Sequence, residues 1–446
     1  MGRILLKNAT IVNENRIFPA DILLEDDVIL KIEDLISSDA ATKALDLEGK
    51  YVMPGAIDDQ VHFREPGLTH KGTIATESRA AVAGGITSFM EQPNTNPQTT
   101  SIEALEEKFD MARNTAFANY SFLFGGTNDN LEEIKKLDKN ACSGIKLFLG
   151  SSTGNMLVDN EQVIENIFRN TEMVISAHCE DEGTIRANLA KYKELYGDDI
   201  PIKYHPLIRS AEACYLSSSS AIALAKKTGA RFHVFHLSTG KETELFRNDI
   251  PLEDKKITAE VCIHHLWFSE EDYDTKGTLI KWNPAVKSAS DRSQLWEALL
   301  DDRIDVVATD HAPHTLEEKS NIYTSAPSGG PLVQHALPAM LENYHAGKIS
   351  LEKIVEKMCH NPAKLFQIKN RGFIREGFYA DLVVLDLNDS WKVTKENIAY
   401  KCGWSPFEGS SFKSKITHTF VNGHLAYENG NFSKERNAMR LTFNRE

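Results

Sequence analysis

The sequence lacks the features that mark secreted, disulfide-stapled and membrane-spanning proteins. Its six cysteines are scattered and form no CxxC pair, which is typical of reduced thiols rather than of a disulfide framework. No apolar run approaches the roughly 20 residues that a membrane helix needs. The first residues show neither an apolar signal core nor a cleavage site. We therefore expect a cytoplasmic protein with no membrane partner.

Positive charge is also scarce. The chain has 50 lysines and arginines against 64 aspartates and glutamates, for a net charge of -14. Nucleic acids and anionic membranes require a basic surface, so the composition argues against both as partners. The expected partner is a small molecule, and an anionic one would have to meet positive charge that is placed locally.

Strand-rich segments are present at both ends of the chain. Short β-rich runs separated by turns fill residues 1–53 and return in residues 375–446. Because these ends enclose a different pattern, we predict one small, β-sandwich-like domain assembled from the two termini. The enclosed residues 54–374 are long enough for a barrel with insertions.

Eight short apolar runs lie between these ends, separated by stretches long enough to hold helices. The runs are 52–63, 86–91, 120–124, 144–149, 173–178, 232–237, 257–263 and 304–309. Apolar residues at helical spacing over 102–112 and an Ala- and Leu-rich stretch over 210–227 predict helices of an outer ring. This alternation predicts an α/β fold, a distorted TIM (β/α)8 barrel.

Side chains able to bind a metal or an anion gather at the carboxyl ends of these runs. They are His62, Arg64, Asn94, Lys146, His178, His236, Asp310 and His314. A lone histidine is more often a structural residue, but in a barrel these ends meet on one face. The alignment of several such residues therefore predicts a metal-dependent site.

Lys146 is the unusual member, since it lies in an apolar strand where a charged amine is costly to bury. A neutral amine can add carbon dioxide to give a carbamate, an anionic ligand able to bridge two cations. We predict this N6-carboxylysine rather than a surface lysine. Two cations held by imidazoles and oxygens would best be zinc, which generates a nucleophilic hydroxide at neutral pH.

The remaining polar residues suit catalysis and substrate binding. Asp310 could bind one metal and carry a proton from the attacking water to a leaving nitrogen. The candidates for binding a substrate carboxylate and its amide edges are Arg64, Asn94, Asn283 and His314.

Five stretches together resemble the dihydroorotases, a family of cyclic amidohydrolases. They are VHFREPG at 61–67, QPNTNP at 92–97, SAHCED at 176–181, FHLS at 235–238 and ATDHAPH at 308–314. The resemblance implies zinc-dependent, reversible ring opening of (S)-dihydroorotate to N-carbamoyl-L-aspartate, a step of de novo pyrimidine (UMP) biosynthesis. Relatives often form dimers, so it is also compatible with a homodimer.

The resemblance also assigns roles to individual residues. His62 and Asp310 look like ligands of a first metal, His178 and His236 like those of a second, and Lys146 like the bridging carboxylated lysine. The substrate-binding set it implies is Arg64, Asn94, Asn283, His314, Ser328 and Gly329.

One position departs from the family pattern. The first strand usually reads His-x-His-x-Arg, and here Gln60 replaces the first histidine. An amide oxygen is a weaker ligand for zinc than an imidazole, so we expect two zincs per chain with the first loosely held.

Two alternatives remain open. A hydantoinase or dihydropyrimidinase would hydrolyse a related cyclic amide, but most such substrates carry no carboxylate and would not need Arg64. A non-catalytic dihydroorotase-like partner protein would account for Gln60, although the substrate-binding set is intact.

Overall fold

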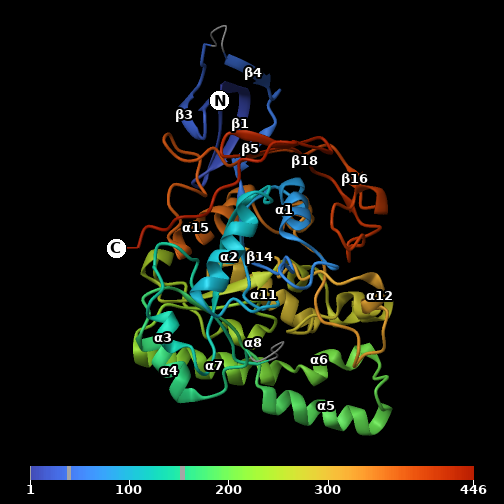
Figure 1. The fold of residues 1–446 in the computed structure, drawn as a ribbon. Helices are drawn as coiled ribbons and strands as arrows, with labels where there is room; N and C mark the ends of the chain where they lie inside the picture. The colour runs from blue at the N-terminus through green and yellow to red at the C-terminus, as the bar shows by residue number, and fades with distance from the viewer. Residues whose placement is uncertain (1, 38–41, 151–155, 446) are drawn as a thin grey trace.

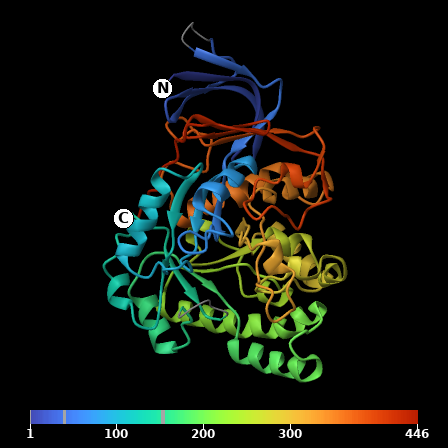
Figure 2. The same cartoon turned by 45° about the vertical axis from the view of Figure 1, so that its right-hand side comes forward.

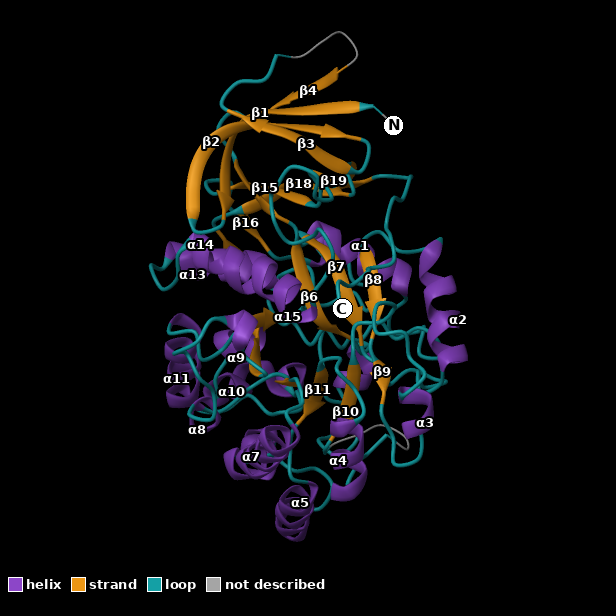
Figure 3. Ribbon diagram, turned by 90° about the vertical axis from the view of Figure 1, so that its left-hand side faces the viewer, coloured by secondary structure: helices purple, strands orange, loops and turns teal. Residues whose placement is uncertain are grey.

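Eight strand positions close a barrel at the centre of the molecule. The computed structural model describes residues 2–37, 42–150 and 156–445. The barrel strands are β6 (Ala56–Val61), β7 (Ile86–Glu91), β8 (Asn119–Phe122) continued by β9 (Phe124–Gly125), β10 (Ile145–Phe148), β11 (Ile175–His178), β12 (Phe232–Val234), β13 (Ile257–Cys262) and β14 (Val306–Ala308). All pair in parallel, and His62 N donates to His311 O at 2.7 Å where the chain after β14 meets β6. The predicted barrel is confirmed (Figure 3).

Helices surround this barrel (Figure 1). The two predicted helices are present as α2 (Ile102–Arg113) and α7 (Ala211–Thr228). Each begins where a serine, Ser101 or Ser210, accepts a hydrogen bond from the backbone N–H three residues on. The other longer helices are α1 (Ile74–Ala83), α4 (Glu161–Arg169), α5 (Glu182–Tyr196), α11 (Ala289–Leu300) and α13 (Ala336–His345). None of the described helices is long and apolar enough to cross a membrane.

Strands from both termini form a second sheet above the barrel (Figures 1 and 2). Its members are β1 (Arg3–Asn13), β2 (Arg16–Glu25), β3 (Val28–Glu33), β4 (Thr42–Asp46), β5 (Tyr51–Pro54), β15 (Leu382–Asp386), β18 (Lys415–Val421), β19 (His424–Glu428) and β20 (Asn431–Phe432). The C-terminal strand β15 lies between β5 and β18, so that Val383 pairs with Met53 on one side and Thr419 on the other. Buried residues from both ends, such as Ile22 and Val384, share one core.

The first predicted run, 52–63, contains two strands rather than one, and the prediction of a single strand there is wrong. Strand β5 belongs to the terminal sheet and β6 to the barrel. Gly55 separates them, and its N–H donates to Asp381 O at 2.9 Å. A Cβ on Gly55 would lie 2.0 Å from Thr87 Oγ1, so only glycine allows the chain to pass so close here.

The division into a terminal domain and a barrel at residues 53/54 and 374/375 stays a prediction, which the shared terminal core supports. The end of the chain also contacts the barrel. Tyr120 N donates to Met439 O at 3.0 Å, and Leu441 N donates to Tyr120 O at 2.9 Å. The last described residues therefore extend the terminal segment along the barrel.

Candidate active site

The predicted site residues come together in one cavity of about 260 Å³ at the carboxyl ends of the barrel strands. The cavity is lined by His62, Arg64, Asn94, Lys146, His178, His236, Asn283, Asp310, His314, Ser328 and Gly329, together with Gln60. They come from eight separate stretches of the chain. The barrel topology is what brings them together.

A larger hollow of about 720 Å³ lies elsewhere on the protein, but its charges are already paired. Lys255 Nζ lies 2.7 Å from Asp305, and both Lys353 and Lys357 reach Asp302 within 2.9 Å. A hollow whose charged groups neutralise one another offers little to a ligand. The smaller cavity is therefore the better candidate for the active site.

His178 and His236 form one half of the predicted metal centre. His178 Nδ1 lies 2.9 Å from His236 Nε2. Burial lowers the pKa of both imidazoles, so both are neutral at pH 7 and have a lone pair for a metal. At this distance the two nitrogens share a hydrogen bond, and because they face each other they could both ligate one cation in its place.

Glu180 fixes the orientation of His178, and the sequence analysis did not single it out. His178 Nε2 lies 2.8 Å from Glu180 Oε2, which leaves Nδ1 as the atom that faces His236. Glu180 also pairs with Arg209. Although burial opposes it, the Arg209 charge and the His178 hydrogen bond lower the pKa of Glu180 to about 2. The signal was its place two residues after His178, on the same side of an extended chain.

His62 and Asp310 form the other half. His62 Nδ1 lies 2.8 Å from Asn94 Oδ1, and its Nε2 lies 3.1 Å from Asp310 Oδ1. Asn94 can accept only if Nδ1 carries the proton, so the Nε2 lone pair is directed at Asp310. Gln60 completes this side with an amide oxygen, 3.6 Å from Cys262 Sγ. The donor atoms of both halves suit a cation, and those of the His62 half would bind it more weakly.

Lys146 lies between these halves on β10 with its side chain 1% exposed. Its Nζ lies 4.1 Å from the ring centre of Phe235 and 4.9 Å from that of Phe148. No hydrogen bond or ion pair of this amine is found within residues 2–37, 42–150 and 156–445. Burial lowers the pKa of Lys146 to about 7, so much of the amine is neutral at physiological pH.

Arg64 supplies the positive charge of the cavity. Its Nε donates to Pro313 O at 3.0 Å, and a terminal nitrogen lies 3.0 Å from His314 Nε2. No carboxylate approaches the guanidinium within 4 Å in the part of the chain that the structure describes. Burial lowers the pKa of Arg64 to about 10, which still leaves it charged. A buried cation without an anionic partner is suited to bind an anionic ligand.

The Ser328–Gly329 turn forms another wall of the cavity. Gly329 has a φ of +124°, and a Cβ there would lie 2.6 Å from Ala312 O. Its N–H donates to Lys281 O at 2.8 Å, and Lys319 Nζ donates to its carbonyl at 2.7 Å. Both backbone hydrogen-bonding groups of Gly329 are therefore used within the protein. Its role in the site is to let the turn lie close to Ala312, which a side chain would prevent.

Three residues of this site have a strained backbone conformation. Arg64, His236 and Asp310 have φ values of +72°, +41° and +50°, in the left-handed region that residues other than glycine rarely adopt. Such conformations persist when the surrounding structure fixes them, and they cluster at functional sites. Here each one lies at the end of a barrel strand.

Comparisons with known proteins give a consistent result. A family model described as "Amidohydrolase family" matches residues 51–426. A dihydroorotase of Methanosarcina acetivorans is 34% identical over 420 residues, which cover 92% of this chain and 89% of that protein. A dihydroorotase of Halobacterium salinarum is 36% identical over 360 residues, 80% of this chain and 82% of that protein. The solved L-hydantoinase (dihydropyrimidinase) of Arthrobacter aurescens superposes with a TM-score of 0.93 at 30% identity, covering 99% and 100% of the two chains.

Proposed function

The chain belongs to the amidohydrolase family, and from this premise and the cavity we propose that it is a dihydroorotase. It would catalyse the reversible hydrolytic ring opening of (S)-dihydroorotate to N-carbamoyl-L-aspartate, in the cytoplasm and within pyrimidine biosynthesis. The alternative of a non-catalytic partner protein is disfavoured, because the cavity retains the His178–His236 pair, the His62–Asp310 pair and Lys146.

The observation that carries the proposal is the buried Arg64. Its guanidinium has no carboxylate partner among the described residues, and it lines the same cavity as the metal-binding candidates. Dihydroorotate carries a carboxylate on its ring, and a fork of N–H donors matches that group. Asn94, Asn283 and His314 surround the same space and can meet the amide edges of the ring.

We propose two zinc ions, with His62 and Asp310 on the first, His178 and His236 on the second, and carboxylated Lys146 between them. The amine of Lys146 has no hydrogen bond or ion pair among the described residues, and this and its lowered pKa support carboxylation. When bound, the pair of ions would supply a hydroxide at neutral pH and polarise the scissile carbonyl.

Asp310 is proposed as the proton carrier. Its carboxylate lies at the cavity wall, 3.1 Å from His62 Nε2, where it can accept a proton from the attacking water and return it to the leaving ring nitrogen. Asp310→Asn should keep the fold and lower kcat by roughly 10²- to 10⁴-fold. Circular dichroism and the rate of carbamoyl-aspartate formation check this, and a fully active variant would rule the role out.

A second candidate is a hydantoinase-type activity on uncharged cyclic amides, favoured by the TM-score of 0.93 to an L-hydantoinase. Such a substrate would leave the buried charge of Arg64 without a carboxylate from the ligand or from the described residues, which costs free energy. The cavity therefore favours the anionic substrate.

The deciding experiment compares turnover of dihydroorotate with that of dihydrouracil, which lacks the carboxylate, in wild type and Arg64→Gln. We expect wild type to strongly prefer dihydroorotate. Loss of the charge-assisted hydrogen bonds should raise KM for dihydroorotate by about 10- to 100-fold, with little change for dihydrouracil. Equal turnover of both substrates by the wild type would favour the hydantoinase-type activity over the dihydroorotase activity.

A further inference from the structure

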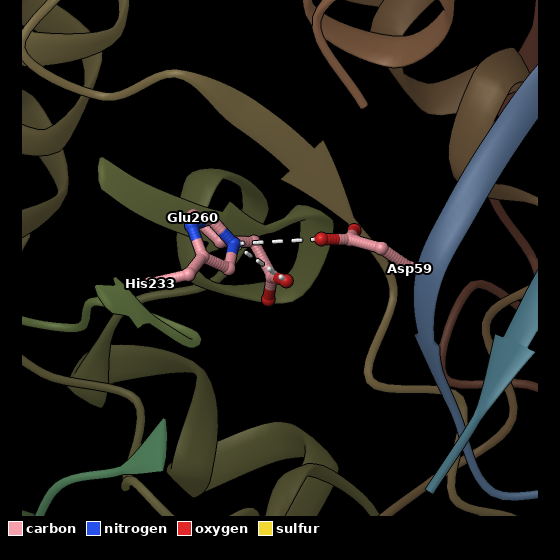
Figure 4. A group of neighbouring side chains, drawn as sticks. All are labelled: Asp59, His233 and Glu260. Atoms are coloured by element: carbon pink, nitrogen blue, oxygen red, sulfur yellow. Dashed lines mark ion pairs between the residues drawn. The ribbon is translucent and has the colours of Figure 1, made fainter. Parts of the chain in front are cut away.

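A second group of metal-binding side chains lies inside the barrel, outside the cavity. It consists of Asp59 on β6, His233 on β12 and Glu260 on β13, whose ligand atoms all lie within 4.8 Å of one another. Figure 4 shows the three side chains meeting from different strands. Each is 0% exposed, and none lines the catalytic cavity.

The distances in this group do not suit hydrogen bonds. His233 Nε2 lies 3.4 Å from Asp59 Oδ2 and 3.7 Å from Glu260 Oε2. An N–H···O bond would need about 2.7–3.2 Å. Donor atoms arranged tetrahedrally around zinc at bond lengths of about 2.1 Å are about 3.4 Å apart. The observed spacing is longer than that of a hydrogen bond and close to that of ligands around a cation.

Four polar atoms of this group also lack a hydrogen-bond partner among the described residues. Both Asp59 oxygens, Glu260 Oε2 and His233 Nε2 make no hydrogen bond in the described part of the chain. Two buried carboxylates beside one imidazole are costly unless a charge of opposite sign compensates them. His233 Nδ1 lies 2.8 Å from Thr258 Oγ1, so a proton on Nδ1 leaves the Nε2 lone pair directed inward.

We propose that Asp59, His233 and Glu260 bind a divalent cation, best matched by Zn²⁺, in the barrel interior and separate from the catalytic centre. One imidazole and two carboxylates are borderline ligands that suit zinc. The remaining coordination position would be filled by a second carboxylate oxygen or a water.

The ion would act as a positioning element under the catalytic cavity. Glu260 Oε1 accepts from His236 N at 3.2 Å and from Cys262 Sγ at 3.2 Å, and Cys262 Sγ lies 3.6 Å from Gln60 Oε1. A cation on the other Glu260 oxygen would hold this carboxylate in place. The segment that carries His236 and the side chain of Gln60 would be held with it.

The competing explanation is a shared proton. Although burial opposes it, Asp59 and Glu260 raise the pKa of His233 to about 9 when no cation is present. In that case an imidazolium would occupy the centre of the group, and no metal would be found. The two explanations differ in metal content, which can be measured without reference to activity.

The test combines metal counting with anomalous diffraction on the full-length protein reconstituted with Zn²⁺. Wild type should carry one more zinc per chain than Asp59→Asn and Glu260→Gln. Asp58→Asn is the matched control, because Asp58 is also buried but accepts a hydrogen bond from Thr309 and is not part of this group. A zinc-edge anomalous map of wild type should show a peak between the three side chains, distinct from any peak at His178 and His236.

Equal zinc content in wild type and Asp59→Asn, or no anomalous peak at the three side chains, would overturn the proposal in favour of the shared proton. If the variants do not fold, the wild-type map decides alone. Because the catalytic centre gives its own peaks, a failure of the proposed function is seen separately.

Discussion

The two halves of the proposed metal centre differ in how their candidate ligands are held. On one side, His178 is fixed by the Glu180 carboxylate at 2.8 Å and faces a second imidazole, His236, at 2.9 Å. On the other, His62 is fixed by the neutral amide of Asn94, and Gln60 contributes only an amide oxygen. A carboxylate partner raises the basicity of a ligating imidazole more than an amide does. The two sites should therefore bind zinc with unequal affinity, and the His178 site should bind it more tightly.

Removing the residue common to both halves should have the largest effect. Lys146→Ala deletes the proposed bridge, so both ions should be lost and turnover should fall by at least about 10⁴-fold. Metal content by mass spectrometry and the rate on dihydroorotate measure this. Added short carboxylic acids should restore part of both, because they can occupy the vacated space as a two-oxygen ligand. Normal metal content and rate in the variant would remove Lys146 as the bridge.

Weakening the His178 site alone should bring the zinc affinities of the two sites closer together. Glu180→Gln replaces the carboxylate that orients His178 with an amide, like the one that orients His62. Zinc affinity of the second site should fall by about 10- to 100-fold, measured by competition with a chelator. Glu182→Gln is the matched control, because Glu182 pairs with Arg186 on the exposed side of α5. Unchanged affinity in Glu180→Gln would mean that the two halves are equal.

The pH should control how both halves are assembled. Lys146 reacts with carbon dioxide only as the neutral amine, and its pKa is lowered to about 7. The amine is mostly charged below this value and mostly neutral above it. At a fixed concentration of dissolved carbon dioxide, reactivation of metal-free protein by zinc should therefore be about 10-fold slower at pH 6 than well above pH 7. A reactivation rate that is flat across this range would contradict the role of the neutral amine.

The side chains that line the cavity could be predicted from the sequence, because strand ends in a barrel converge and most of the runs end in a residue able to bind a metal or an anion. Residues that act by positioning another side chain were harder to predict. Glu180 was overlooked because its role depends on the rotamer of His178. Asp59 and Glu260 lie in the interior of strands, where sequence does not show which side chains meet. The split of the first run at Gly55 depended on a contact with Thr87, distant in sequence.

Strengthening the weaker half should give the smallest effect. Gln60→His places an imidazole where an amide oxygen now lies, which should raise the zinc occupancy of the first site at limiting zinc by a few-fold. Turnover should rise only in proportion to occupancy, and KM should stay the same, because Gln60 is not in the proposed substrate-binding set. Titration of metal-free protein with zinc, followed by activity, measures both quantities. Gln60→Ala serves as the control in the opposite direction. If Gln60→His binds zinc no better than wild type, the cavity already holds its first ion through His62, Asp310 and Lys146, and the inequality between the halves does not arise from Gln60.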